Sequence, residues 1–174
     1  ILPGVEITAR CEGLPDGEIH IVGVGLNPFH VPLRKALTRI RVAKAKRFNA
    51  LTKTLQERYP QLKAQLFAMT RPGSELQKWD VVRTLVALHA ADSEREAKRS
   101  IVDPIWRELE ADIPIPILNV DEVCQLIRQA GGVAIWAHPH ESVTELDPER
   151  LAHWLRQFKQ AGLDGVEAHR SKLS

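Results

Sequence analysis

A long helical stretch between two segments of short strands is the feature that most constrains this fold. Residues 1–30 alternate strand-like runs with turn signals such as Pro15-Asp16-Gly17. Residues 31–116 carry apolar residues at helical spacing and show no strand signal until their proline-rich exit. Residues 117–174 alternate helices and strands again. We therefore predict an α/β domain built from the first and last segments, interrupted by an all-helical insertion.

The last segment contains clear signals for helix ends. Asn119 with Glu122 three residues later predicts a capped helix start, and Gly131-Gly132 predicts its end. The strand Val133–Ala137 follows, Pro148 suits the first position of the next helix, and Gly162 predicts its end. Helices that end at glycine and lead into strands are typical of βα units, so we expect a mostly parallel sheet.

Several helices are expected within the insertion. Apolar residues recur three, four and seven or eight positions apart over residues 33–55, which predicts one amphipathic helix. A second helix fits Trp79–Ala91. Ser93 with Glu96 three residues later forms a capping-box pattern that begins a third, and Pro104 should kink or divide it.

Composition sets only broad limits on function. At 174 residues and 44% hydrophobic content, the chain can bury one ordinary core with a small appendage. The formal net charge of +2 is too mild to indicate nucleic-acid binding by itself. Cys11 and Cys124 lack the spacing of a metal site, which favours reduced structural thiols. With no long apolar run and no signal peptide in this sequence, we expect no membrane span and a cytoplasmic location.

Three residues that can bind metal lie in or beside strand-like runs. Glu6 closes the strand-like run Leu2–Glu6, His20 lies between Ile19 and Ile21, and His138 follows the strand Val133–Ala137. Two strands joined by the Gly13–Gly17 loop would place Glu6 and His20 on neighbouring backbone segments. In a barrel of parallel strands, the carboxyl ends also converge on one mouth. One carboxylate and two imidazoles form the ligand set of catalytic metal sites that keep a position open for water. Taken singly, Glu6 also fits a solvated rim residue, and His20 a hydrogen-bonded core histidine.

Four segments, in this order, resemble motifs of the PHP (polymerase and histidinol phosphatase) superfamily: Leu2–Glu6, Glu18–Gly23, Gly131–Pro139 and Leu163–Glu167. The likeness is greatest to the stand-alone phosphoesterases that act on nucleoside bisphosphates and short RNA. It implies an incomplete, distorted βα barrel of the TIM-like PHP type, with barrel parts at 1–30 and 117–174. It also implies two or three divalent ions, usually manganese, iron or zinc, and hydrolysis of phosphate esters by a metal-bound hydroxide.

The resemblance assigns roles to individual residues. Glu6, His20 and His138 inherit metal-ligand positions, with Glu6 bridging two ions, whereas the position of Glu167 is generally not a ligand. The family also carries a His-x-His strand, an acidic ligand and a Thr-Asp-His motif upstream, and a Ser-Asp-x-His strand downstream. None of these is in this sequence. We therefore expect the chain to be a piece of a longer protein that holds part of the ligand set.

The candidate residues for substrate binding lie in the helical insertion, and two further histidines are candidates for contact with phosphate or for proton transfer. Between Arg34 and Arg58 there are nine basic residues against one acid, Glu57. They fit either a solvated helix face or an electropositive lid that attracts a phosphorylated small molecule or short nucleic acid. The residues that we consider candidates for substrate binding are Arg34, Arg39, Arg41, Lys44 and Arg47. His140 and His169 are candidates to contact phosphate or to donate a proton.

Two other functions remain open. In the first, the chain is a catalytically inactive PHP-like module that binds nucleic acid or a protein partner, for which the basic helix would matter and the metal would not. Alternatively, it is an amidohydrolase-like metal hydrolase, which would act on amides or lactones. Alanine at Glu6 or His138 would abolish turnover in either enzyme and leave binding by an inactive module intact.

Overall fold

The computed structural model describes residues 1–14, 17–68, 78–139 and 148–167 of the chain. It divides into two compact units. The first, here called the sheet unit, comprises residues 1–38 and 117–174, and the second, the helical unit, comprises residues 39–116. Each unit is described separately below.

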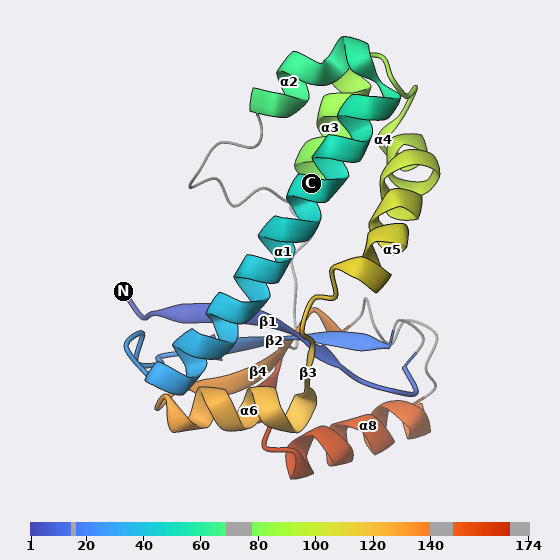
Figure 1. Ribbon diagram of the computed structural model, residues 1–174. Helices are drawn as coiled ribbons and strands as arrows, with labels where there is room; N and C mark the ends of the chain where they lie inside the picture. Colours follow the sequence, from blue (N-terminus) through green and yellow to red (C-terminus); the bar gives the residue numbers. More distant parts are fainter. Residues whose placement is uncertain (15–16, 69–77, 140–147, 168–174) are drawn as a thin grey trace. The chain divides into compact units, whose positions relative to one another are not determined.

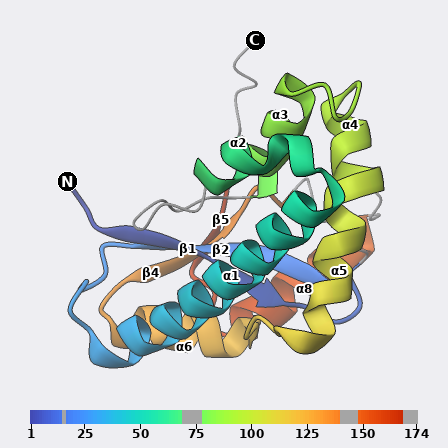
Figure 2. The same ribbon diagram turned by 45° about the horizontal axis from the view of Figure 1, so that its top comes forward.

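The described part of the sheet unit contains one open five-stranded sheet in the order β3-β1-β2-β4-β5. Its strands are β1 (Gly4–Arg10), β2 (Glu18–Val24), β3 (Leu118–Asn119), β4 (Val133–Ala137) and β5 (Gly165–Val166). Figure 1 shows the longer strands, and Figure 2 also labels β5, which pairs with β4 at the edge of the sheet. The protein is thus an α/β protein, as predicted.

The prediction of a mostly parallel sheet is wrong. β2 runs antiparallel to both β1 and β4, and only the β1–β3 and β4–β5 pairs are parallel. Residues 11–17 connect β1 to β2, closed by a 2.8 Å hydrogen bond from the Cys11 N–H to the Gly17 carbonyl. A loop of this length permits a hairpin but not the crossover that parallel neighbours need. Only the β4–β5 pair is joined through a helix of the expected βα kind.

One face of this sheet is covered by two helices, α6 (Val120–Gln129) and α8 (Pro148–Gln160). Alternate strand residues enter that core, among them Ile7, Ile21 and Trp136. Since side chains alternate between the faces of a strand, the intervening residues of β1 and β2 point to the other face. One face of the sheet therefore packs against α6 and α8, and the side chains of the opposite face are available to form a site.

The ends of α6 and α8 follow the sequence prediction. The backbone N–H of Asn119 donates to the Glu122 carboxylate at 2.8 Å, as one half of a capping box. Gly131 and Gly162 adopt positive φ angles of 80° and 101° just after the two helices. There, backbone hydrogen bonds such as Leu163 N–H to Phe158 carbonyl (2.9 Å) close Schellman turns.

Helices make up the described part of the helical unit. They are α1 (Val31–Arg58, whose first residues belong to the sheet unit), η1 (Pro60–Leu62), α2 (Lys63–Ala68), α3 (Lys78–Ala87), α4 (Glu94–Glu96), the π-helical turn η2 (Ala97–Val102) and α5 (Asp103–Asp112). Buried side chains from α1, α3 and α5 form one apolar core, with Leu55, Leu85 and Ile105 almost fully enclosed. No helix among the described residues is long and apolar enough to cross a membrane.

The sequence predicted the start and the division of the third helix of this unit correctly, but not the end of the second. The Ser93 hydroxyl caps the Glu96 N–H at 3.2 Å, and the third predicted helix is divided by η2 ahead of Pro104, as expected for proline. The second predicted helix, Trp79–Ala91, is too long, because α3 ends at Ala87. A Schellman turn ends it, with His89 at a φ of 56° where glycine is usual.

Candidate metal centre

The hairpin of β1 and β2 brings Glu6 and His20 together. In its register Glu6 pairs with Val22 and His20 pairs with Thr8, so Glu6 and His20 are diagonal neighbours. Both lie on the face that points away from the α6 and α8 core. Glu6 does not end a strand as predicted, because β1 continues to Arg10. The pairing of two strands, and not the convergence of strand ends, places these two side chains.

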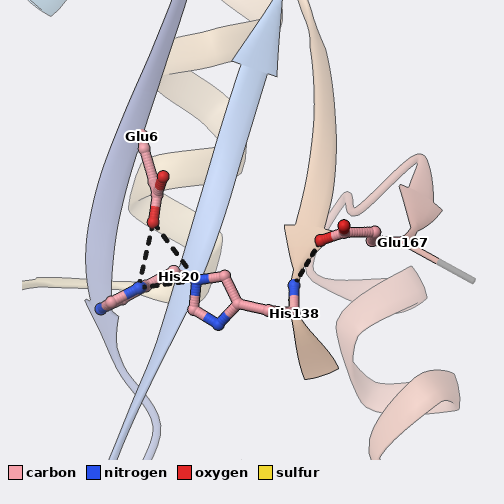
Figure 3. A network of polar contacts seen from close by, with 4 residues as sticks. All are labelled: Glu6, His20, His138 and Glu167. Atoms are coloured by element: carbon pink, nitrogen blue, oxygen red, sulfur yellow. Dashed lines mark hydrogen bonds and ion pairs between the residues drawn. The ribbon is translucent and has the colours of Figure 1, made fainter. Parts of the chain in front are cut away.

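His138 reaches the same place from the end of β4. If β4 continued in extended form, strand alternation would put residue 138 on the core face with Ala134 and Trp136. Instead, His138 has a φ of 34°, in the left-handed region that non-glycine residues rarely adopt. Its imidazole extends towards Glu6 and His20 (Figure 3). Unusual backbone conformations of this kind often occur at functional sites.

Glu167 holds the backbone of His138. Its carboxylate accepts a 2.7 Å hydrogen bond from the His138 N–H, and its own N–H donates to the Trp136 carbonyl at 2.9 Å. Figure 3 shows the Glu167 side chain directed at the backbone of His138, on the far side from the two other ligand candidates. Sequence reasoning set Glu167 aside. The signal that could have found it is an acid directly after a short strand that pairs with the strand leading into His138.

The three ligand atoms form a nearly equilateral triangle. His20 Nδ1 lies 3.0 Å from His138 Nε2 and 3.1 Å from Glu6 Oε1, and His138 Nε2 lies 3.3 Å from Glu6 Oε1. Zinc binds imidazole nitrogen and carboxylate oxygen at about 2.0–2.2 Å, which requires ligand atoms about 2.8–3.6 Å apart for angles from octahedral to tetrahedral. All three distances fall within this interval.

Hydrogen bonds alone do not account for this triangle. Each imidazole nitrogen offers one proton or one lone pair. Bonds from both His20 Nδ1 and His138 Nε2 to the ionised carboxylate need two protonated nitrogens, whereas a bond between these nitrogens needs one of them unprotonated. No single protonation pattern satisfies all three contacts. A cation suits all three at once, because each atom then contributes a lone pair, and we conclude that the residues fit a divalent metal ion.

Solvent reaches this cluster. The side chains of Glu6, His20 and His138 are 52%, 36% and 18% exposed. A histidine of the apolar core, the alternative reading of His20, is therefore excluded, since its ring lies on the face opposite the core. A partly exposed ligand set on one side of a sheet is open to an ion, to water and to a substrate.

The other predicted residues are placed differently. Arg34, Arg39, Arg41 and Lys44 are exposed along α1, as an electropositive surface requires. Arg47, in contrast, is 2% exposed. Its Nε donates a 2.8 Å hydrogen bond to the Ile113 carbonyl, and its guanidinium lies 5.3 Å from the centre of the Trp106 ring. Arg47 therefore packs inside the helical unit and is not part of an exposed basic surface, because it falls on the apolar side of α1 beside Phe48.

His140 and His169, the two candidates for proton transfer, lie outside the described residues. Cys11 and Cys124 are free and buried, in agreement with the prediction of reduced structural thiols. Burial raises the pKa of each thiol from 9.0 to about 11, and for Cys124 the charge of Asp164 adds to this increase. Both thiols are therefore protonated and unreactive near neutral pH.

Comparison with known proteins identifies the fold. No protein-family model and no curated protein sequence matches this chain. Among solved structures, a proposed metal-dependent phosphoesterase from Bifidobacterium adolescentis is similar, with a TM-score of 0.66 and 22% sequence identity over 95% of this chain. An amidohydrolase from Chromobacterium violaceum, solved with bound sulfate and no metal, is similar to the same extent, with a TM-score of 0.66 and 21% identity.

The chain spans only about half of these two proteins, 56% of each. Its fold thus resembles part of the fold of a proposed metal-dependent phosphoesterase and of an amidohydrolase, and the described part is a mixed open sheet with covering helices.

Proposed function

We propose that this chain belongs to a metal-dependent phosphoesterase of the PHP type and carries part of its metal centre. The observation that carries the proposal is the triangle of Glu6, His20 and His138, whose ligand atoms lie 3.0–3.3 Å apart on a solvent-accessible face. The likeness of the fold to part of a proposed metal-dependent phosphoesterase supports it.

In this proposal Glu6, His20 and His138 hold one divalent ion, of manganese, iron or zinc. Such an ion would polarise a phosphoryl oxygen and make water more acidic at neutral pH. The two imidazoles must be unprotonated at the ligating atoms, Nδ1 of His20 and Nε2 of His138, and the Glu6 carboxylate supplies the negative charge. Figure 3 shows the second oxygen of Glu6 directed away from both imidazoles, which suits a carboxylate that bridges to a second ion.

The substrate class that we propose is the phosphate esters of nucleotides or short RNA. The exposed cations of α1, Arg34, Arg39, Arg41 and Lys44, support it, since clustered positive charge raises the local concentration of phosphorylated ligands. Arg47 does not contribute, because it is buried.

Metal analysis and an activity assay together test this function. Protein purified without chelator should contain manganese, iron or zinc, and the Glu6→Ala and His138→Ala variants should lose it. Phosphate release from nucleoside bisphosphates or short RNA should depend on the same residues. Metal binding without phosphoesterase activity, but with turnover of amides or lactones, would favour the amidohydrolase alternative. The similarity of the fold to the C. violaceum structure is the reason to test that alternative. Nucleic-acid binding that survives both substitutions, with no metal bound, would favour an inactive module.

A further inference from the structure

Two carboxylates flank β5, and each accepts a hydrogen bond from the backbone, one within β4 and one at the residue that follows it. Asp164, just before β5, accepts a hydrogen bond from the Ala134 N–H at 2.9 Å and donates its own N–H to the Ala134 carbonyl at 2.9 Å. Glu167, just after β5, accepts from the His138 N–H at 2.7 Å. Since β5 itself pairs through only two residues, these side chains extend the pairing at both ends of the strand.

The two carboxylates differ in what they act on. Asp164 binds a residue in the regular part of β4 and also forms a 3.1 Å ion pair with Arg128. Glu167 binds the residue whose φ is 34° and whose imidazole belongs to the candidate metal centre. The two interactions are chemically alike, but only one of them adjoins a ligand.

An anchored N–H at residue 138 affects the direction of its side chain. The hydrogen bond fixes the peptide plane before His138, and φ, the rotation from that plane, sets where Cβ and the imidazole point. A left-handed φ is unfavourable for a non-glycine residue, so it needs support from surrounding contacts. A short hydrogen bond to an ionised carboxylate is among the stronger contacts available.

We propose that Glu167 is a positioning residue of the metal centre, which holds His138 in the left-handed conformation that aims its Nε2 at Glu6 and His20. Glu6 and His20 are placed by the β1–β2 hairpin and do not need this support. The third ligand therefore depends on β5, a strand that contributes no ligand itself within the described residues. This inference rests on the proposed function where it concerns metal, and otherwise on the hydrogen bond and backbone conformation at His138.

Substitutions at Glu167 separate position from charge. Glutamine keeps an oxygen that can accept the His138 N–H and removes the charge, whereas aspartate keeps the charge and is one methylene shorter. We expect Glu167→Gln to bind Zn²⁺ like the wild type, and Glu167→Asp and Glu167→Ala to bind it about 10-fold more weakly or worse. Asp164→Ala is the matched control, since it removes the corresponding contact at the other end of β5 and should leave Zn²⁺ affinity unchanged.

Affinity would be measured by isothermal titration of each variant with Zn²⁺ alone, and the amide of His138 would be followed by NMR in the metal-free protein. The amide proton should move upfield in Glu167→Ala and Glu167→Asp, and by a smaller amount in Glu167→Gln, whose neutral oxygen still accepts the hydrogen bond but more weakly. Wild-type affinity in Glu167→Asp with weak binding in Glu167→Gln would overturn the proposal in favour of a charge effect. An unchanged His138 amide in Glu167→Ala would also overturn it.

The two ideas can fail separately. If the wild type binds no Zn²⁺, the proposed function fails, while the amide signal still decides whether Glu167 holds residue 138. If the wild type binds Zn²⁺ and His138→Ala does not, but every Glu167 variant binds like the wild type, only the positioning role fails.

Discussion

Replacing His89 by glycine should stabilise the protein. His89 occupies the left-handed position of the Schellman turn that ends α3, with a φ of 56°. The turn is complete, since the N–H of His89 donates to the Val86 carbonyl at 3.0 Å and the N–H of Ala90 to the Leu85 carbonyl at 2.9 Å. The side chain of His89 is exposed, so that its removal costs little packing.

The size of the effect follows from two opposing terms. A left-handed conformation costs an ordinary residue about 1–2 kcal/mol, which glycine avoids. Glycine also gains about 0.5–1 kcal/mol of conformational freedom in the unfolded chain, which opposes the benefit. The net stabilisation of His89→Gly should therefore be roughly 0.5–1 kcal/mol, or a rise in Tm of about 1–4 °C for a chain of this size.

Thermal unfolding followed by circular dichroism would measure this effect, with His153→Gly as a control. His153 is exposed within α8, where φ is helical, so the same substitution should lower Tm there. The opposite signs of the two changes would attribute the gain at position 89 to backbone conformation. A lower Tm for His89→Gly would refute the reasoning and show that the imidazole contributes more than its conformation costs.

Two further outcomes concern buried groups. Burial raises the pKa of Cys124 from 9.0 to about 11, so the unfolded chain releases this proton first as pH rises. Urea titrations at pH 8 and 11 should therefore show that this thiol's contribution to the free energy of unfolding falls by about 2 kcal/mol, in addition to the loss from Cys11. A Cys124→Ala variant with an equal loss would contradict this assignment. Arg47→Ala should lower the free energy of unfolding by roughly 2–4 kcal/mol, because it leaves the Ile113 carbonyl without its charged donor. The Zn²⁺ affinity of Arg47→Ala should equal that of the wild type. A large decrease in affinity would mean that Arg47 contributes to the metal site after all.

Local signals in the sequence predicted local structure well. The capping pair Asn119 and Glu122, the strand Val133–Ala137 and the glycine after α8 were all read correctly, because each depends on contacts within a few residues. The end of α3 was missed because histidine occupies the position where glycine is usual. Capping chemistry predicts helix ends only where the sequence uses the common residues.

Strand direction and the details of the site required the structure. Glycine-terminated helices suggested parallel strands, but the short loop after β1 makes β1 and β2 an antiparallel hairpin. The residues named as ligand candidates do lie together. The neighbouring strands that carry Glu6 and His20 were expected from the short loop between them, whereas the convergence of parallel strand ends was not found. The left-handed φ of His138 and the contact from Glu167 depend on pairing between segments far apart in the chain, which no local pattern reveals.

The most direct test of the account is the stoichiometry and affinity of Zn²⁺ binding, measured by isothermal titration of the metal-free protein. The account predicts at least one ion per chain for the wild type and a loss of that binding in each of Glu6→Ala, His20→Ala and His138→Ala, with the circular dichroism spectrum unchanged. Wild-type protein that binds no ion, or variants that all bind like the wild type, would contradict the claim that this triangle is a metal centre.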